Sequence, residues 1–115
     1  MWMVDPRIMC RQHLLGEHLE THMFLSVIKK GCISLGGYIR HNLLEVCSLK
    51  TRHDALAAEM MRRGYNHQTP MEECDVSNAM VQNIKIDIEK SQEELLRRCR
   101  RCLERYDMLQ KGESV

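Results

Sequence analysis

Between Asp5 and Gly31, apolar residues recur at the three- and four-residue intervals of an α-helix. The stripe consists of Ile8, Leu15, Leu19, Met23 and Val27. Asp5 can cap the free amides of a helix, Pro6 suits its first turn, and Gly31 suits the residue that follows its last turn. The pattern predicts a first helix over residues 6–30, with this stripe as its apolar face.

Two further stripes predict a second helix over residues 45–63, ended by Gly64, and a third over residues 87–109, capped by Asp87. The second stripe is Val46, Leu49, His53, Leu56 and Met60, and the third is Leu95, Cys99, Cys102, Tyr106 and Leu109. Glycine, proline and turn formers predict long connections over residues 31–44 and 65–83, and the tail 110–115 is expected to be disordered. The pattern therefore predicts an all-α fold, a single compact domain of three main helices over residues 1–115.

Composition supports helices packed through aliphatic side chains, because the 115 residues include only one Trp, one Phe and three Tyr. The net charge of +1 does not indicate a strongly basic nucleic-acid binder. The charges are nevertheless segregated, since basic segments at 29–63 and 95–111 flank an acidic one at 71–94. The basic segments either meet in a patch that attracts phosphate or form ordinary solvated helix faces.

Six cysteines, no signal peptide and no apolar run of 18 residues predict reduced thiols in an intracellular protein without membrane contact. Cys99 and Cys102 form one CxxC pair, but a structural zinc needs four ligands, so burial as small apolar groups is favoured. His18 and His22 lie one turn apart and would need a further zinc ligand from elsewhere in the chain. Spacing does not choose among the candidates His41, His53 and His67. No metal or cofactor is therefore predicted.

The stretch "CRQHLLGEHLETH" concentrates polar chemistry on the predicted first helix. At 100° per residue, His13, Glu17 and Glu20 lie within about 60° of one another. Such a face can bind a metal, support acid–base chemistry or simply contact water. Gly16 favours a functional role, because a glycine inside a helix costs up to ~1 kcal/mol relative to alanine and permits close approach of a backbone, ligand or substrate.

Three segments resemble the small pyrimidine-dimer DNA glycosylases of phage type, the endonuclease V-like family. They are "RQHLLGEHLE" (11–20), "RHDALAAEMMRRGYNHQTP" (52–70) and "DIEKSQEELLRRCRRC" (87–102), and they occur in the family's order over about half of the chain. The resemblance implies a compact three-helix fold with long connections. It also implies a DNA repair enzyme that is both a glycosylase and an abasic-site lyase.

By this resemblance, the nucleophile is the α-amine of the first residue, here Met1, which attacks C1′ of the sugar and forms a Schiff base before β-elimination. α-Amines titrate near pH 7.7 to 8.0, which leaves a useful neutral fraction at pH 7. The family's essential glutamate falls on Glu20, with the role of stabilising positive charge on the sugar and moving protons. Trp2 is too bulky for the usual removal of the initiator methionine, so either the amine is that of Met1 itself or the true start of the protein differs.

The resemblance also implies DNA contacts. The family's Gln-His pair falls on Gln12 and His13, beside the sugar-phosphate, and Gly16 marks the point of close approach. Guanidinium groups suit phosphate, so the candidate phosphate contacts are Arg11, Arg52, Arg62 and Arg63. The expected partner is duplex DNA with damaged pyrimidines or abasic sites. A monomer is expected in the cytoplasm, associated with the nucleoid, or in the host-cell cytoplasm if the protein is viral.

Two departures from the family keep other hypotheses open. Met23 occupies a position where the phage enzymes carry an arginine, and the chain ends in "RYDMLQKGESV" without their aromatic segment. One rival is a non-catalytic DNA-binding or helical interaction protein on the same scaffold. The other is a metal-binding helical domain that uses His18, His22 and a distant residue.

Overall fold

The computed structural model describes residues 1–29, 48–67, 70 and 86–113, and all regular structure in these residues is helical. The elements are a 3₁₀ turn η1 (Pro6–Ile8) and the α-helices α1 (Arg11–Lys29), α3 (Leu49–Arg62), α5 (Ile88–Arg98) and α6 (Arg100–Gln110). The prediction of an all-α fold is confirmed. The described part of the chain holds four α-helices, however, and not the three that were predicted.

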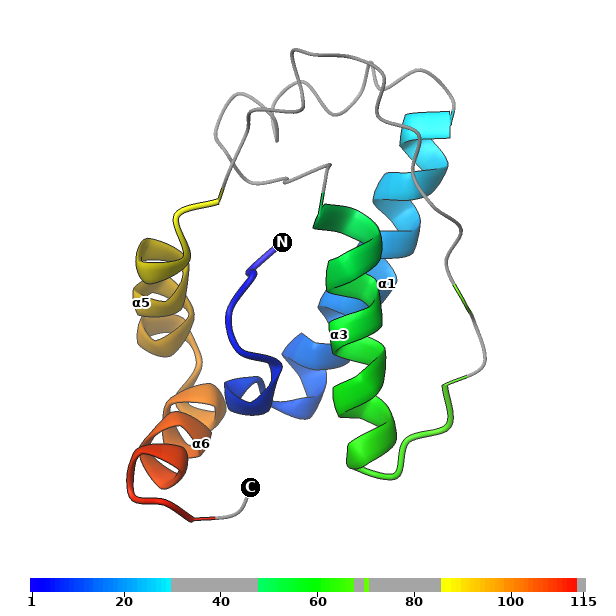
Figure 1. Ribbon diagram of the computed structural model, residues 1–115. Coiled ribbons are helices and arrows are strands. Elements are labelled where there is room, and N and C mark those ends of the chain that lie inside the picture. Colours follow the sequence, from blue (N-terminus) through cyan, green and yellow to red (C-terminus); the bar gives the residue numbers. More distant parts are fainter. Residues whose placement is uncertain (30–47, 68–69, 71–85, 114–115) are drawn as a thin grey trace.

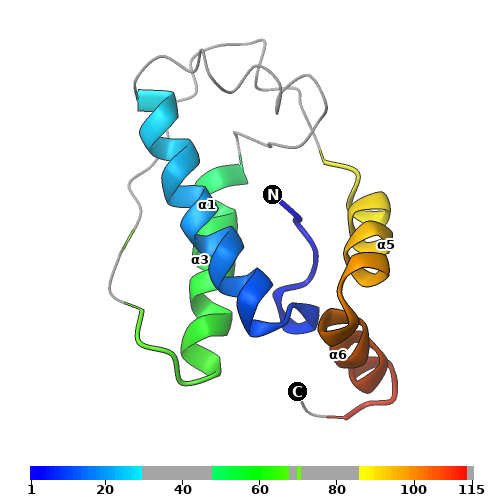
Figure 2. The ribbon, with the colours of Figure 1, turned by 180° about the vertical axis from the view of Figure 1, so that it is seen from behind.

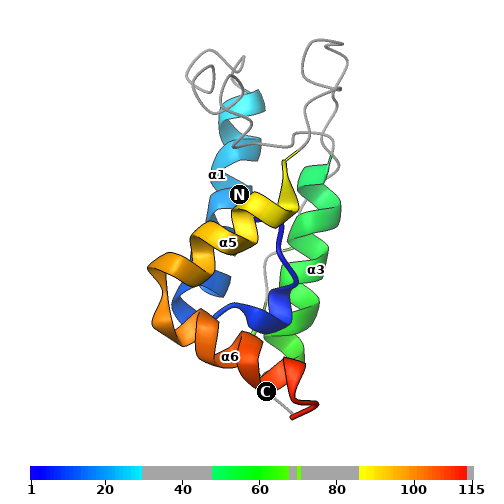
Figure 3. The same ribbon diagram turned by 90° about the vertical axis from the view of Figure 1, so that its left-hand side faces the viewer.

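The N-terminal segment runs through the middle of the fold. On one side of it α1 and α3 pack against each other, and on the other side lie α5 and α6 (Figures 1 and 2). The view from the side shows α5 and α6 covering this segment, with α6 packed against η1 (Figure 3). None of the helices in the described ranges is both long and apolar enough to cross a membrane.

The predicted helix 6–30 is divided into η1 and α1 by Met9, whose extended backbone has φ −76° and ψ 132°. Asp5 does act as a cap, since its carboxylate accepts the Arg7 N–H at 3.0 Å, but it caps only the short turn. Met9 and Cys10 are almost fully buried. Packing of these two side chains in the core outweighs the local preference for one continuous helix.

The apolar face predicted for the first helix is wrong in part, because Leu19 is 70% exposed and Met23 is 45% exposed. The side chain of Val27 lies outside the described part. The buried face of α1 is formed instead by Leu14, Glu17, Thr21, Phe24 and Leu25. Because Glu17 is charged, the sequence pattern placed its side of the helix in solvent. In the structure Glu17 is buried in an ion pair with Arg52 of α3.

The second helix matches its prediction closely. The stripe residues Leu49, His53, Leu56 and Met60 are all buried in α3, while Val46 lies outside the described residues. The helix ends where expected, because Gly64 adopts a left-handed conformation with φ 86°. The Tyr65 N–H then donates to the Met60 carbonyl at 2.8 Å and closes the helix end.

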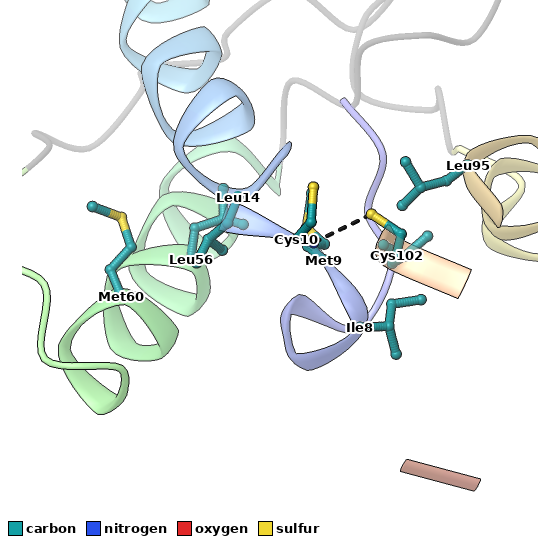
Figure 4. Packing of buried hydrophobic residues seen from close by; sticks show 9 residues of the cluster. Ile8, Met9, Cys10, Leu14, Leu56, Met60, Leu95 and Cys102 are labelled. Atoms are coloured by element: carbon teal, nitrogen blue, oxygen red, sulfur yellow. Dashed lines mark hydrogen bonds between the residues drawn. The ribbon is translucent and has the colours of Figure 1, made fainter. Parts of the chain in front are cut away.

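The single third helix that was predicted over 87–109 is broken at Cys99. Asp87 caps α5 as expected, accepting the Lys90 N–H at 3.2 Å, but Cys99 has an extended backbone with φ −125° and ψ 108°. Neither glycine nor proline stands at this position, so no local signal marks the break. A tertiary contact accounts for it, because α6 turns towards η1 and Cys102 meets Cys10 (Figure 4).

The core joins all of these elements. It lies where the N-terminal segment meets α1, α3, α5 and α6, as Figure 4 shows. Its buried residues are Val4, Ile8, Met9, Cys10, Leu14, Leu56, Met60, Leu95 and Cys102. Burial of this apolar surface fixes the N-terminal segment in the centre of the molecule and thereby determines where the amine of Met1 lies.

Candidate active site

The amine of Met1 contacts a carboxylate on α1. Its nitrogen lies 2.7 Å from Oε1 of Glu20, a distance that gives both a hydrogen bond and an ion pair. The Glu20 side chain is 34% exposed, so the pair opens towards solvent. The structure therefore brings together the two residues that the sequence selected as a catalytic pair.

Glu17, one turn before Glu20, holds the next residue of the N-terminal segment. Its Oε1 accepts the backbone N–H of Trp2 at 3.1 Å. Both oxygens of Glu17 also bind Arg52 of α3, from Nε to Oε2 at 2.5 Å and from Nη2 to Oε1 at 3.0 Å. Nη1 of Arg52 donates to the Val4 carbonyl at 2.6 Å. This pair fastens the N-terminal segment to α1 and α3.

Burial makes the pair between Glu17 and Arg52 a strong constraint. Only 2% of Glu17 and 5% of Arg52 are exposed. A buried ion pair of this kind does not need to add net stability, but removal of one partner leaves an uncompensated buried charge. The two residues therefore act as a clamp whose position depends on both charges.

Two further features direct Met1 towards Glu20. Met3 has φ 60°, the left-handed conformation that residues other than glycine rarely adopt, so the chain turns sharply between Val4 and the amine. From α5, the Ser91 hydroxyl donates to the Trp2 carbonyl at 2.5 Å. The amine is thus held by α1, α3 and α5 together and is not a frayed end.

Comparison with protein families agrees with this geometry. A family model described as pyrimidine dimer DNA glycosylase matches residues 1–73. The chain belongs to this family. The match includes both the amine pair and the clamp, whereas α5 and α6 lie beyond it. Neither the curated proteins nor the solved structures that were searched gave a match.

The α1 surface beside Glu20 is open. Gly16 lies one turn before Glu20 and is exposed, and a Cβ added there would meet nothing within 4 Å. Arg11 and Gln12, at the start of the helix, are also exposed, with the Arg11 guanidinium 5.2 Å from the centre of the Tyr65 ring. Arg11 does not lie beside Glu20, because nine residues of helix place it about 13.5 Å away along the axis and on the opposite side. No described part of the protein itself approaches Gly16, so its absent side chain leaves room for a partner from outside.

Four arginines gather at the other end of α3 around the buried carboxylate of Glu59. Burial tends to raise the pKa of Glu59, but hydrogen bonds from Arg62 and Arg63 lower it below its usual value. Arg63 is mostly buried and also donates to the carbonyls of Pro6 and Met9, whereas the side chain of Arg62 is 47% exposed. The cluster is completed by Arg7 and by Arg105, whose Nε donates to the Arg7 carbonyl at 3.0 Å.

The arginines named by the sequence therefore separate into two kinds. Arg52 and Arg63 have their guanidinium groups engaged and buried inside the protein. Arg11 is exposed, and Arg62 is 47% exposed although both of its described hydrogen bonds go to Glu59. Arg52 and Arg62 are ten residues apart on α3, or about 15 Å along the helix axis. The structure brings Arg52 next to the amine pair and places Arg62 away from it.

The described histidines fall into two groups, His13 alone and His18 together with His22, His53 and His67. His13 faces Cys10, with 3.2 Å between its Nδ1 and the cysteine Sγ. His18 meets two of the three distant candidates, His53 of α3 and His67, while His41 lies outside the described residues. Burial and, to a smaller extent, the neighbouring imidazoles together lower the pKa of His18 to about 4, so His18 is neutral at pH 7.

Proposed function

We propose that this member of the family is a DNA glycosylase with abasic-site lyase activity on damaged pyrimidines in duplex DNA, acting through the α-amine of Met1. The observation that carries the proposal is the 2.7 Å contact between that amine and the carboxylate of Glu20, whose side chain is partly exposed to solvent. An amine nucleophile paired with an acid–base group is the arrangement that such chemistry requires.

In the first step, the neutral amine attacks C1′ of the damaged nucleotide. The bond from C1′ to the base breaks, and the base leaves with the electron pair and takes up a proton. Glu20 accepts a proton from the attacking amine and stabilises the positive charge that develops on the sugar. Opening of the sugar ring gives a Schiff base between the Met1 nitrogen and C1′.

In the second step, a base removes a proton from C2′ of the Schiff base. The electron pair moves to form a double bond between C2′ and C3′, and the C3′–O bond breaks with the phosphate as the leaving group. Glu20 is the carboxylate positioned for this transfer, because it remains next to the nitrogen that carries the sugar. Water then hydrolyses the Schiff base and restores the amine.

DNA binding is assigned to the accessible residues, namely Arg11, Gln12 and Gly16 on α1 and Arg62 at the end of α3. Arg52 and Arg63 act as positioning residues in this proposal, because their side chains are at most 9% exposed and their donors are engaged by Glu17, Glu59 and backbone carbonyls. Arg62 also pairs with Glu59, but its side chain is 47% exposed and can reach a phosphate from that pair. The amine is held inside the fold, so C1′ must be brought to it by flipping the nucleotide out of the stack.

The competing hypothesis is a DNA-binding protein on the same scaffold without catalysis, and Glu20→Gln distinguishes the two. Under single-turnover conditions, an oligonucleotide duplex with one abasic site should be cleaved at least ~100-fold more slowly by this variant, within the usual range for loss of acid–base catalysis. Glu89→Gln removes an exposed carboxylate on α5 and should leave the rate unchanged. Equal cleavage by both variants would overturn the assignment of Glu20, and binding without cleavage by the wild type would favour the rival.

A further inference from the structure

Three cysteines and one histidine from opposite ends of the chain meet beside the N-terminal segment. Their ligand atoms, the Sγ atoms of Cys10, Cys99 and Cys102 and the Nδ1 atom of His13, all lie within 4.8 Å of one another. Cys10 and Cys102 are buried, and Figure 4 shows both pointing into the same region of the core. No metal was predicted from the sequence, because Cys99 and Cys102 supply only two of the four ligands that a structural zinc needs.

Three of the six separations between these ligand atoms are close to those of a tetrahedral zinc site, and all six are within 4.8 Å. Zinc bonds of about 2.3 Å to sulfur and about 2.0 Å to nitrogen place two sulfurs about 3.8 Å apart, and a sulfur and a nitrogen about 3.5 Å apart. Sγ of Cys10 lies 3.8 Å from Sγ of Cys99 and 3.2 Å from Nδ1 of His13. Sγ of Cys102 lies 3.6 Å from the same nitrogen.

The two pairs have the same local structure. Cys10-x-x-His13 stands at the start of α1 and Cys99-x-x-Cys102 at the start of α6. In each pair the backbone carbonyl of the first cysteine accepts the first hydrogen bond of its helix. The Leu14 N–H donates to the Cys10 carbonyl at 2.9 Å, and the Leu103 N–H donates to the Cys99 carbonyl at 3.1 Å. Helix N-termini stabilise thiolates, and the thiolate is the form in which cysteine binds zinc.

The surrounding contacts support this arrangement. The Cys10 N–H donates to Sγ of Cys102 at 3.2 Å, the kind of outer hydrogen bond that orients a thiolate ligand. Trp2 covers His13 with its ring edge at a centroid distance of 6.0 Å. A shared ion also explains why the predicted helix 87–109 breaks at Cys99, since the break is what carries both thiols to Cys10.

We propose that Cys10, His13, Cys99 and Cys102 hold a structural zinc ion that fastens α6 to the start of α1. All four tetrahedral positions are supplied by the protein, which leaves none for substrate. His13 is then a metal ligand and not a DNA contact. The proposal does not depend on the catalytic role of Met1 and Glu20, because no ligand belongs to that pair.

The test begins with metal analysis of untagged protein, purified under reducing conditions without chelator. Zinc should be present and should fall by one equivalent per chain in Cys99→Ser and in Cys102→Ser, and Cys99→His should restore it. The cobalt-substituted wild type should show tetrahedral ligand-field bands and a thiolate-to-cobalt charge-transfer band. Wild-type protein without zinc and without that band, or zinc content unchanged by both serine variants, would overturn the proposal. The wild-type measurements decide even where a variant fails to fold.

A different observation carries a second site, the convergence of three imidazoles. Nε2 of His18 lies 3.2 Å from Nε2 of His53 and 2.9 Å from Nε2 of His67. Nδ1 of His53 faces a carboxylate oxygen of Asp54 at 3.0 Å, which places the proton on Nδ1 and directs the Nε2 lone pair at the other rings. Nε2 of a neutral His18 cannot form good hydrogen bonds with both His53 and His67, since an imidazole nitrogen either donates or accepts a single hydrogen bond.

We infer that His18, His53 and His67 bind a divalent transition metal through their Nε2 atoms, with Asp54 as the outer carboxylate of His53. Three protein ligands leave a position for water or another exchangeable ligand. His53→Gln and His67→Gln should each remove one metal equivalent and leave the thiolate-to-cobalt band intact, and Cys99→Ser should do the reverse. Each cluster is therefore the control for the other. Metal content that is the same in wild type, His53→Gln and His67→Gln would overturn this second site alone.

Discussion

Arg52→Met tests the clamp that positions the amine. The substitution keeps most of the side-chain volume but leaves Glu17 buried at 2% exposure with only the Trp2 N–H as a donor from the N-terminal segment. Loss of one partner of a buried ion pair costs about 3–5 kcal/mol. Against a typical total of 5–15 kcal/mol for a domain, that is a large share of the stability, and it should lower Tm by roughly 10–20 °C.

The assay is urea unfolding followed by circular dichroism, which gives the free energy of unfolding for each variant. Lys50→Met is the matched control, because it removes a charge from the same helix at an exposed pair with Asp54, 2.9 Å from Lys50 Nζ. Exposed pairs contribute under about 1 kcal/mol. A change of less than 1 kcal/mol in Arg52→Met, or an equal change in Lys50→Met, would refute the reasoning.

A double variant separates stability from positioning. Glu17→Leu combined with Arg52→Met removes both charges, so the protein should recover most of the stability that the single variant loses. The Trp2 N–H and the Val4 carbonyl nevertheless lose their partners, and the amine loses its fixed direction. Cleavage of abasic DNA should therefore stay at least ~10-fold below wild type at unchanged DNA affinity, in line with the cost of misplaced reacting groups. Full activity of the stable double variant would show that the clamp does not position Met1.

Three further outcomes follow from single contacts. Gly16→Ala should stabilise the protein by up to ~1 kcal/mol, since the added Cβ meets nothing within 4 Å. The same variant should bind abasic duplex more weakly, and stronger or unchanged binding would contradict the role of Gly16 as a point where DNA approaches the helix. Arg62→Ala should lower the affinity for duplex DNA equally for all sequences. It should also reduce the slope of log affinity against log salt concentration by about 0.9, and an unchanged slope would exclude a phosphate contact. Asp87→Ala should cost about 1 kcal/mol in thermal or urea unfolding because it removes the cap of α5, and no loss would contradict that cap.

The sequence predicted α3 well because local and tertiary preferences agree there. The stripe from Leu49 to Met60 contains no carboxylate and no guanidinium group, and Gly64 supplies the left-handed residue that ends the helix. For α1 the same reasoning selected the wrong face. The burial of Glu17 depends on Arg52, 35 positions later in the chain, and no periodicity within the helix contains that information.

The candidate site divides in the same way. Resemblance to a family named Met1 and Glu20, and the fold places them in contact. The break at Cys99 and the meeting of the two cysteine-containing pairs had no comparable signal, since both depend on contacts across 89 residues. The equal spacing of Cys10-x-x-His13 and Cys99-x-x-Cys102 was present in the sequence, but it indicates a possible four-ligand set only once the fold shows that the two pairs meet.

Trapping of the Schiff base decides whether the Met1 amine is the nucleophile. Untagged protein is incubated with duplex DNA carrying one abasic site in the presence of borohydride, and the covalent adduct is located by mass spectrometry of its peptides. We expect one adduct on the nitrogen of Met1, reduced at least ~10-fold when an extra residue precedes Met1 and displaces the amine from Glu20. An adduct on a lysine, or no adduct from protein that binds the same DNA, would contradict this expectation.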